Sequence, residues 1–208
     1  MHGGRQLQHE RLLFFSDAVF AIAITLLIID IRLPHVAPGS GNAAVADAFL
    51  TLIPHYIGFL LSFFVIGRFW IGHHRIFGLL KDHDDQLIWR NLLFLLSIAV
   101  MPFPTSVISE YGGLSVVVMF YAGWLTLAGL LNRYIIAYIL KTPALLAAPL
   151  SAAKRREFRS GWIPIAAGVS GIIGAACHPY AGIAALAAAP FLLQIGLKWF
   201  GDRKSGSA

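Results

Sequence analysis

The most regular feature of the chain is a series of long apolar runs separated by short polar gaps. Six runs are each close to the ~20 residues that a helix needs to cross the hydrocarbon core of a bilayer. They cover residues 12–33, 49–71, 87–107, 114–136, 162–177 and 180–200. The pattern predicts an all-α, polytopic membrane protein with six transmembrane helices.

The gaps between the runs are short. Residues 34–48 and 103–113 are rich in Pro, Gly and Ser and are predicted to be loops. Only His178 and Pro179 separate the fifth and sixth runs, which should form a tight hairpin because proline has no N–H to offer. No gap is long enough for a soluble domain, so residues 1–208 are expected to form one six-span unit.

Small residues of the last two runs permit close helix packing, either within one subunit or between subunits. They are Gly168, Gly171, Gly174, Ala175 and Gly182.

The first run is apolar and follows two arginines, as in a signal peptide. It is too long for the apolar part of a signal peptide and carries Asp17 and Asp30, so we expect it to stay in the mature protein.

Composition excludes a soluble globular protein. Hydrophobic residues make up 58% of the chain and charged residues 12%, whereas an ordinary soluble domain carries roughly a quarter charged residues. A compact globule of this length has too little interior to hide so much apolar surface, so the surplus must face lipid.

The positions of the charges predict orientation. A net charge of +6 would raise the question of nucleic acid in a soluble protein. Here the basic residues fall between apolar runs, and with the N-terminus inside, 15 of the 16 lie on the cytoplasmic side, leaving Arg32 outside. We therefore predict cytoplasmic N- and C-termini and no nucleic-acid partner. The basic stretch at residues 154–159 is interpreted as an anchor that touches anionic headgroups.

Candidate chemistry begins in the first run, where Ser16 and Asp17 lie about one turn inside an otherwise apolar helix. A carboxylate within the membrane is costly unless it is paired, so Asp17 is a candidate functional residue. At about 100° per residue, four other residues share the nearly opposite face. They are Ile22, Thr25, Leu26 and Ile29.

Two interpretations of the polar pair stay open. Asp17 can meet a cation from the end of the second run, which carries Arg68, His73 and His74. Alternatively, Ser16 caps the first helix and Asp17 lies in its first turn. The adjacent histidines point about 100° apart and cannot chelate one metal ion as histidines four residues apart do, so no metal site is expected.

Signatures of other classes are missing from the sequence. It has no Gly-rich phosphate loop, no nucleophile elbow and no His-Glu-x-x-His helix, so we do not expect an enzyme. It also has no Thr-Val-Gly-Tyr-Gly segment, the carbonyl filter of ordinary potassium channels.

The motif Arg11-x-x-x-Phe15-Ser16-Asp17, followed by seven residues and Thr25, resembles that of prokaryotic members of the lysosomal and endosomal potassium channel family, the transmembrane protein 175 family. Residues 70–77, with their histidine pair, resemble the second-span counterpart. The resemblance implies a homotetrameric, potassium-conducting channel in a bacterial or archaeal cell membrane. Its first helices would line a central pore, with potassium ions as the permeant species and no cofactor.

The resemblance also implies residue roles. Ile22, Leu26 and Ile29 would form a hydrophobic constriction, and either Thr25 or the aliphatic rings would set selectivity. The motif residues would form a structural clasp that holds the pore helix: Arg11, Phe15, Ser16, Asp17, Trp70, His73 and His74.

One detail of the motif and one alternative function remain. If the first helix continued back through Arg11, four copies of Arg11 would place cations at the mouth of the pore. We therefore expect the helix to begin after Arg11 or the Arg11 side chain to reach sideways to a carboxylate.

The alternative function is a secondary or proton-coupled transporter that uses Asp17 and a second-span histidine. The first run has no Gly or Pro before Pro34, whereas transporters often have interrupted helices, and this favours a channel.

Overall fold

A computed structural model describes residues 2–159 and 161–189 of the chain. The named elements in these ranges are all helices. They are α1 (His2–Leu26), α2 (Gly41–Thr51), α3 (Ile53–Phe77), α4 (Asp85–Ala99), α5 (Pro102–Tyr111), α6 (Ser115–Lys141), the short 3₁₀ helix η1 (Pro143–Leu145), α7 (Ala152–Arg159) and α8 (Ile163–Cys177). A further short apolar helix covers Pro179–Ala189.

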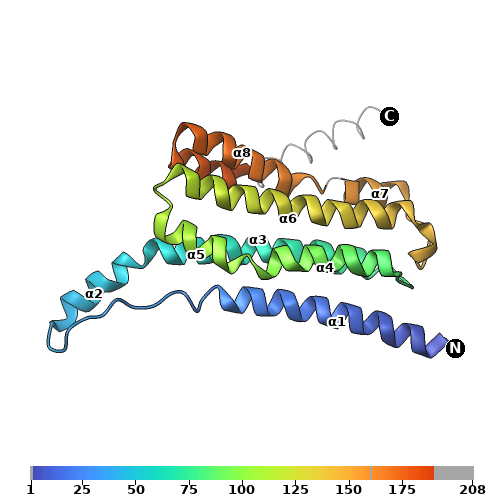
Figure 1. The fold of residues 1–208 in the computed structure, drawn as a ribbon, viewed down its shortest axis with the longest axis horizontal. Coiled ribbons are helices and arrows are strands. Elements are labelled where there is room, and N and C mark those ends of the chain that lie inside the picture. The colour runs from blue at the N-terminus through green and yellow to red at the C-terminus, as the bar shows by residue number, and fades with distance from the viewer. Residues whose placement is uncertain (1, 160, 190–208) are drawn as a thin grey trace.

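The long helices run side by side in layers (Figure 1). Helix α1 lies along one side of the bundle and packs on α3 and α4. Helix α6 packs on α4 and α5 from the other direction, and α8 covers its far side. The middle layer of α3, α4 and α5 therefore separates α1 from α8.

Three helical segments are long and apolar enough to cross a membrane. They are Ile53–Phe77, the α4–α5 segment Asp85–Tyr111, and Ser115–Lys141. They fall on three of the six predicted runs and make the chain a multi-pass membrane protein. The six-span count and the orientation stay predictions, and residues 190–200 of the last predicted run lie outside the described residues.

Several predicted boundaries were wrong. Helix α1 begins at His2 and ends at Leu26, so the tail of the predicted run at residues 12–33 is not helical. The chain tightens there through two turns, in which the Ile29 and Ile31 N–H groups bond the carbonyls three residues back. Apolar runs predict where lipid or core can be, but not where the backbone leaves the helix.

The two predicted loops contain helix. Helix α2 begins at Gly41, within the predicted loop at residues 34–48. Helix α5 occupies Pro102–Tyr111, although residues 103–113 were predicted to be a loop. Proline is tolerated in the first turn of a helix, where its missing N–H has no helical partner, so Pro102 and Pro104 begin α5 rather than prevent it.

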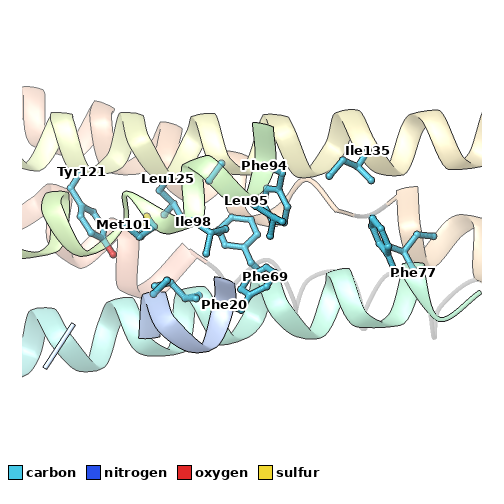
Figure 2. Close-up of a cluster of buried hydrophobic side chains, with 14 of the residues drawn as sticks. Phe20, Phe69, Phe77, Phe94, Leu95, Ile98, Met101, Tyr121, Leu125 and Ile135 are labelled. Carbon is cyan, nitrogen blue, oxygen red and sulfur yellow. The ribbon is translucent and has the colours of Figure 1, made fainter. Parts of the chain in front are cut away.

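The core is built from interlocking aromatic and aliphatic side chains (Figure 2). Phe94 of α4 is fully buried, and its ring lies 5.9 Å from that of Phe20 of α1 and 5.7 Å from that of Phe69 of α3. The T-shaped geometry of both pairs is one that aromatic rings favour. The buried face of α1 is thus fixed against two other helices.

Glycines set the close approach of α8. A Cβ atom on Gly168 would lie 2.1 Å from Thr126 Oγ1 of α6, and one on Gly174 would lie 3.0 Å from Gly182 Cα of the following helix. Within the described part of the chain, these small residues therefore bring helices together inside one subunit.

Candidate functional site

Helix α1 has one packed face and one apolar face that stays largely exposed within residues 2–159 and 161–189. Phe20, Ala23 and Leu27 are buried against the bundle. The stripe predicted to line a pore points away from it, because Ile22 is 58% exposed, Leu26 40% and Ile29 54%. None of these three side chains is therefore buried within the described part of the subunit.

The Thr25 side chain lies on the same exposed face. Its hydroxyl donates to the Ile22 carbonyl at 2.9 Å, a common bond for hydroxyls in membrane helices. The proton is thus engaged within the helix, while the oxygen keeps its lone pairs for another partner. An exposed hydroxyl oxygen in this state can accept a hydrogen bond or contact a cation.

Ile29 reaches the exposed side by a different route from that predicted. The helical arithmetic assumed a continuous helix, but α1 ends at Leu26 and Ile29 lies in the turn that follows. The Ile29 N–H bonds the Leu26 carbonyl at 3.1 Å, which keeps the turn close to the helix end. Ile22 and Leu26 therefore share a helical face, while Ile29 continues the stripe from a turn.

A buried chain of hydrogen bonds joins α1 to α3 and α4. Asn91 Nδ2 of α4 donates to Ser16 Oγ at 2.9 Å, and Asn91 Oδ1 lies 2.8 Å from His73 Nε2 of α3. Because that amide oxygen can only accept, His73 carries its proton on Nε2. Ser16 in turn donates to the Leu12 carbonyl at 2.9 Å. All three side chains are buried, so three helices share one polar contact.

Asp17 forms a separate contact closer to the surface. Its Oδ1 accepts a hydrogen bond of 2.8 Å from Trp70 Nε1 of α3. The Trp70 ring in turn lies 5.5 Å from that of His74, which is exposed. The bond gives Asp17 an indole N–H as its partner, where a cation from the second run was expected. The alternative that Ser16 caps the helix was wrong, because α1 begins fourteen residues earlier, at His2.

The other two motif residues stand apart from these contacts. Phe15 is exposed, seven residues before Ile22 and thus on nearly the same helical face. Helix α1 runs straight through Arg11, so the expectation that the helix begins after this residue was wrong. Arg11 lines an open pocket of about 430 Å³ together with Asp85 and His83.

Asn91 is the residue that the sequence analysis missed. A lone amide in the apolar run at residues 87–107 was a usable signal, since a buried amide needs partners from other elements.

The sequence analysis also missed a second buried chain of hydrogen bonds. Thr105 Oγ1 donates to Ser62 Oγ at 2.7 Å, and Ser62 Oγ lies 2.9 Å from Tyr121 Oη. It joins α5, α3 and α6.

Within residues 2–159 and 161–189, no group of three or more His, Cys, Asp or Glu side chains could hold a metal ion. The arrangement is therefore a polar clamp behind an exposed apolar stripe. Nothing in the contacts around Asp17 or His73 supplies a nucleophile next to a base.

Comparison with known proteins points to one family. Residues 11–102 match the family described as "Endosomal/lysosomal potassium channel TMEM175". The match covers residues 11–26 of α1, the contacts of Ser16 and Asp17, and the exposed stripe. Over these residues, slightly less than half of its length, the chain resembles the TMEM175 family.

Individual TMEM175 relatives agree in sequence and in fold. A potassium channel of Streptomyces collinus is 42% identical over 97 residues, which are 47% of this chain and 46% of that protein. The human endosomal/lysosomal proton channel TMEM175 is 24% identical over 148 residues, 71% of this chain and 29% of that protein. The matched stretch thus spans about half the length of the bacterial relative or less than a third of the human one.

The crystal structure of a relative extends the likeness to nearly the whole length of this chain. It is the structure of a lysosomal potassium-selective channel TMEM175 homolog from Chamaesiphon minutus, at 26% sequence identity and a TM-score of 0.74. The superposition covers 91% of this chain and 98% of that one. The helical arrangement in Figure 1 therefore resembles that of this TMEM175 homolog.

Proposed function

We propose that the chain is the subunit of a potassium channel that conducts passively through a central pore lined by α1. The observation that carries this proposal is the face of α1 on which Ile22, Thr25, Leu26 and Ile29 are all exposed. One such face cannot enclose a pathway, whereas copies of it around a symmetry axis can. The bacterial relative named a potassium channel supports potassium as the permeant ion.

The assembly we propose is a homotetramer with four copies of α1 around the axis. In this arrangement the subunit's partners are its own copies and the surrounding lipid. The charge asymmetry supports cytoplasmic termini, and the bacterial relatives support a bacterial or archaeal cell membrane. Transport through such a pore requires no cofactor and no catalytic residue.

The proposed pore selects and gates by two effects. Rings of Ile22, Leu26 and Ile29 would narrow the pathway and resist wetting, which is how hydrophobic constrictions close a channel. A ring of Thr25 hydroxyl oxygens would replace part of the water around a dehydrated ion. Since the Thr25 proton already bonds the Ile22 carbonyl, its oxygen is poised as an acceptor toward a cation.

The polar contacts behind α1 would hold it in place. The Ser16–Asn91–His73 chain joins α1 to α3 and α4, and the Asp17–Trp70 bond fixes the same turn of α1 a second time. We assign these residues a structural role, as clamps of the pore helix. Phe15 and Arg11 lie on or near the exposed face and belong with the pathway or with neighbouring copies.

The second candidate is a proton-coupled transporter or proton pathway that uses Asp17 and a histidine. The observation in its favour is the likeness to a human protein named a proton channel. The contacts of Asp17 speak against direct exchange with His73, since Asp17 bonds Trp70 and His73 bonds Asn91.

Potassium flux in proteoliposomes tests the proposal. Ile22→Ala should change the rate of potassium flux several-fold, because it widens the narrowest part of the pathway. The matched control is Ile57→Ala on α3, whose side chain is exposed to the same degree (57%, against 58% for Ile22). It should leave the flux unchanged.

The competing outcome is equally distinct. Flux that is saturable, depends on a proton gradient and is indifferent to Ile22→Ala would support the transporter. Absence of any potassium flux from the wild-type protein would end the channel proposal.

A further inference from the structure

Helix α7 is the most hydrophilic helix of the structure and lies outside the three candidate spans. It follows α6 and lies beside the C-terminal part of that helix, at the same end of the bundle as the N-terminal end of α1 (Figure 1). On the predicted orientation this is the cytoplasmic end, where the membrane presents anionic headgroups.

Two contacts join α7 to the end of the bundle, and a third holds the connection before it. Glu157 and Arg75 of α3 form an ion pair at 3.5 Å. Phe158 packs against the hydrophobic core, which turns one side of the short helix inward. The connection before it is paired with the end of α3, through Lys81 N–H to the Leu145 carbonyl at 2.9 Å. Helix α7 is therefore held as part of the fold and not as a loose linker.

Two basic side chains of α7 are exposed. They are those of Lys154 and Arg155, which lie within one turn of Glu157 and Phe158. Basic residues outnumber acidic ones in this helix, so it carries a net positive charge. A surface of this kind attracts phosphates over distances of about a Debye length.

A second group with the same preference lies at the end of α7. The guanidinium of Arg133 on α6 lies 5.4 Å from the ring centroid of Trp162, just before α8. Arg133 Nη1 is buried and has no hydrogen-bond partner, while Trp162 is exposed. Tryptophan and arginine together are typical of the membrane–water interface, where the ring lies among headgroups and the cation meets phosphate.

We propose that α7 and the Arg133–Trp162 pair form a binding site for the headgroup of an anionic phospholipid of the inner leaflet. The phosphate would lie between the exposed Lys154 and Arg155 side chains and the Arg133 guanidinium, whose Nη1 has no hydrogen-bond partner, and the Trp162 ring would contact the glycerol region. Charge complementarity, an unused buried donor and an interfacial tryptophan point to the same occupant. The proposal does not depend on which ion the protein conducts.

The binding of phosphatidylglycerol and phosphatidylcholine to the purified full-length protein, counted by native mass spectrometry, tests this site. Wild-type protein should prefer phosphatidylglycerol. The double variant K154Q/R155Q should lower that preference by about tenfold, because each basic residue near an anionic surface contributes to binding. The variant R133Q should also lower it. Both α7 side chains are exposed, so their replacement leaves the core intact.

The matched control is R68Q/K81Q, which removes the same charge from exposed positions on and after α3. It should retain the preference. Equal loss in the control and in K154Q/R155Q would overturn the proposal in favour of diffuse charge. So would a wild-type protein without preference, a full preference in R133Q, or displacement of the lipid by millimolar inorganic phosphate, which would indicate a site for soluble anions.

Discussion

Asn91 uses both ends of its side-chain amide in the interior, with Nδ2 on Ser16 and Oδ1 on His73. Because neither partner is on its own helix, the orientation of this one amide links the positions of α1 and α3. Interhelical hydrogen bonds in membranes are individually modest, at about 0.6–2 kcal/mol. Their value here is geometric, since they hold α1 at one rotation with its apolar stripe outward.

Replacing Asn91 should therefore destabilise the bundle. Asn91→Leu keeps a similar volume but leaves the His73 Nε2–H buried without a partner, which should cost about 1–3 kcal/mol. Thermal unfolding in detergent, followed by circular dichroism, measures the loss. The control is Ser97→Ala on the same helix, because the buried Ser97 hydroxyl bonds only the Phe94 carbonyl one turn before it. An equal melting shift in both variants would contradict the role given to Asn91.

Single residues divide into those that the sequence could reveal and those that needed the fold. The face shared by Ile22 and Leu26 follows from helical periodicity alone, and the structure shows both side chains exposed on it. The family resemblance put Trp70 in one clasp with Asp17, but it did not identify the two as partners. An indole N–H can satisfy a carboxylate as a cation can, and the sequence does not distinguish the two kinds of donor. The sequence shows Asn91 only as an amide within an apolar run, and does not show which residues it contacts.

At the scale of elements, apolar length predicted α3, α6 and α8 well and α1 poorly. The runs at residues 49–71, 114–136 and 162–177 correspond to most of these three helices. Helix α1 differs at both ends, because its first turns are polar and its exit is set by turns with i to i+3 bonds. Hydrophobicity reports the surroundings of a segment, whereas helix ends depend on local backbone bonding.

The packing of α8 on α6 gives an element-scale prediction. Gly168→Ala should cost about 1–3 kcal/mol, because overpacking forces helices apart. Its Cβ would lie 2.1 Å from Thr126 Oγ1 and 2.7 Å from the Ala122 carbonyl oxygen. The control is Gly123→Ala on α6, which has no atom within 4 Å of the added Cβ. Helix propensity predicts that this change is neutral or stabilising by up to about 1 kcal/mol.

The melting temperature of each variant in one detergent measures this difference. The Gly168 variant should melt below the wild-type protein and the Gly123 variant at or above it. If both glycines tolerate alanine equally, α8 can move away from α6 without loss, and the close approach is not what holds the two helices together.

At the scale of the whole molecule, the layers leave α1 at the edge of the bundle, with one face exposed within the described part of the chain. In a monomer this face would contact lipid, which is a favourable environment for its apolar side chains. The Thr25 hydroxyl and the Arg11 side chain, exposed on or near the same face, fit lipid less well. A water-filled axis shared by several copies accommodates both kinds of residue.

Cysteine cross-linking distinguishes these two environments. The chain has one native cysteine, Cys177, which is exposed, so the experiment starts from Cys177→Ser. In that background Ile22→Cys should form disulfide-linked pairs of chains in membranes under mild oxidation, because copies of α1 around one axis bring this position together. The control is Ile173→Cys on α8, exposed to 64% and separated from α1 by the middle layer. It should stay monomeric on a non-reducing gel. Cross-linking from position 173 with none from position 22 would place the subunit contact on α8, and the exposed stripe of α1 would then face lipid and not ions.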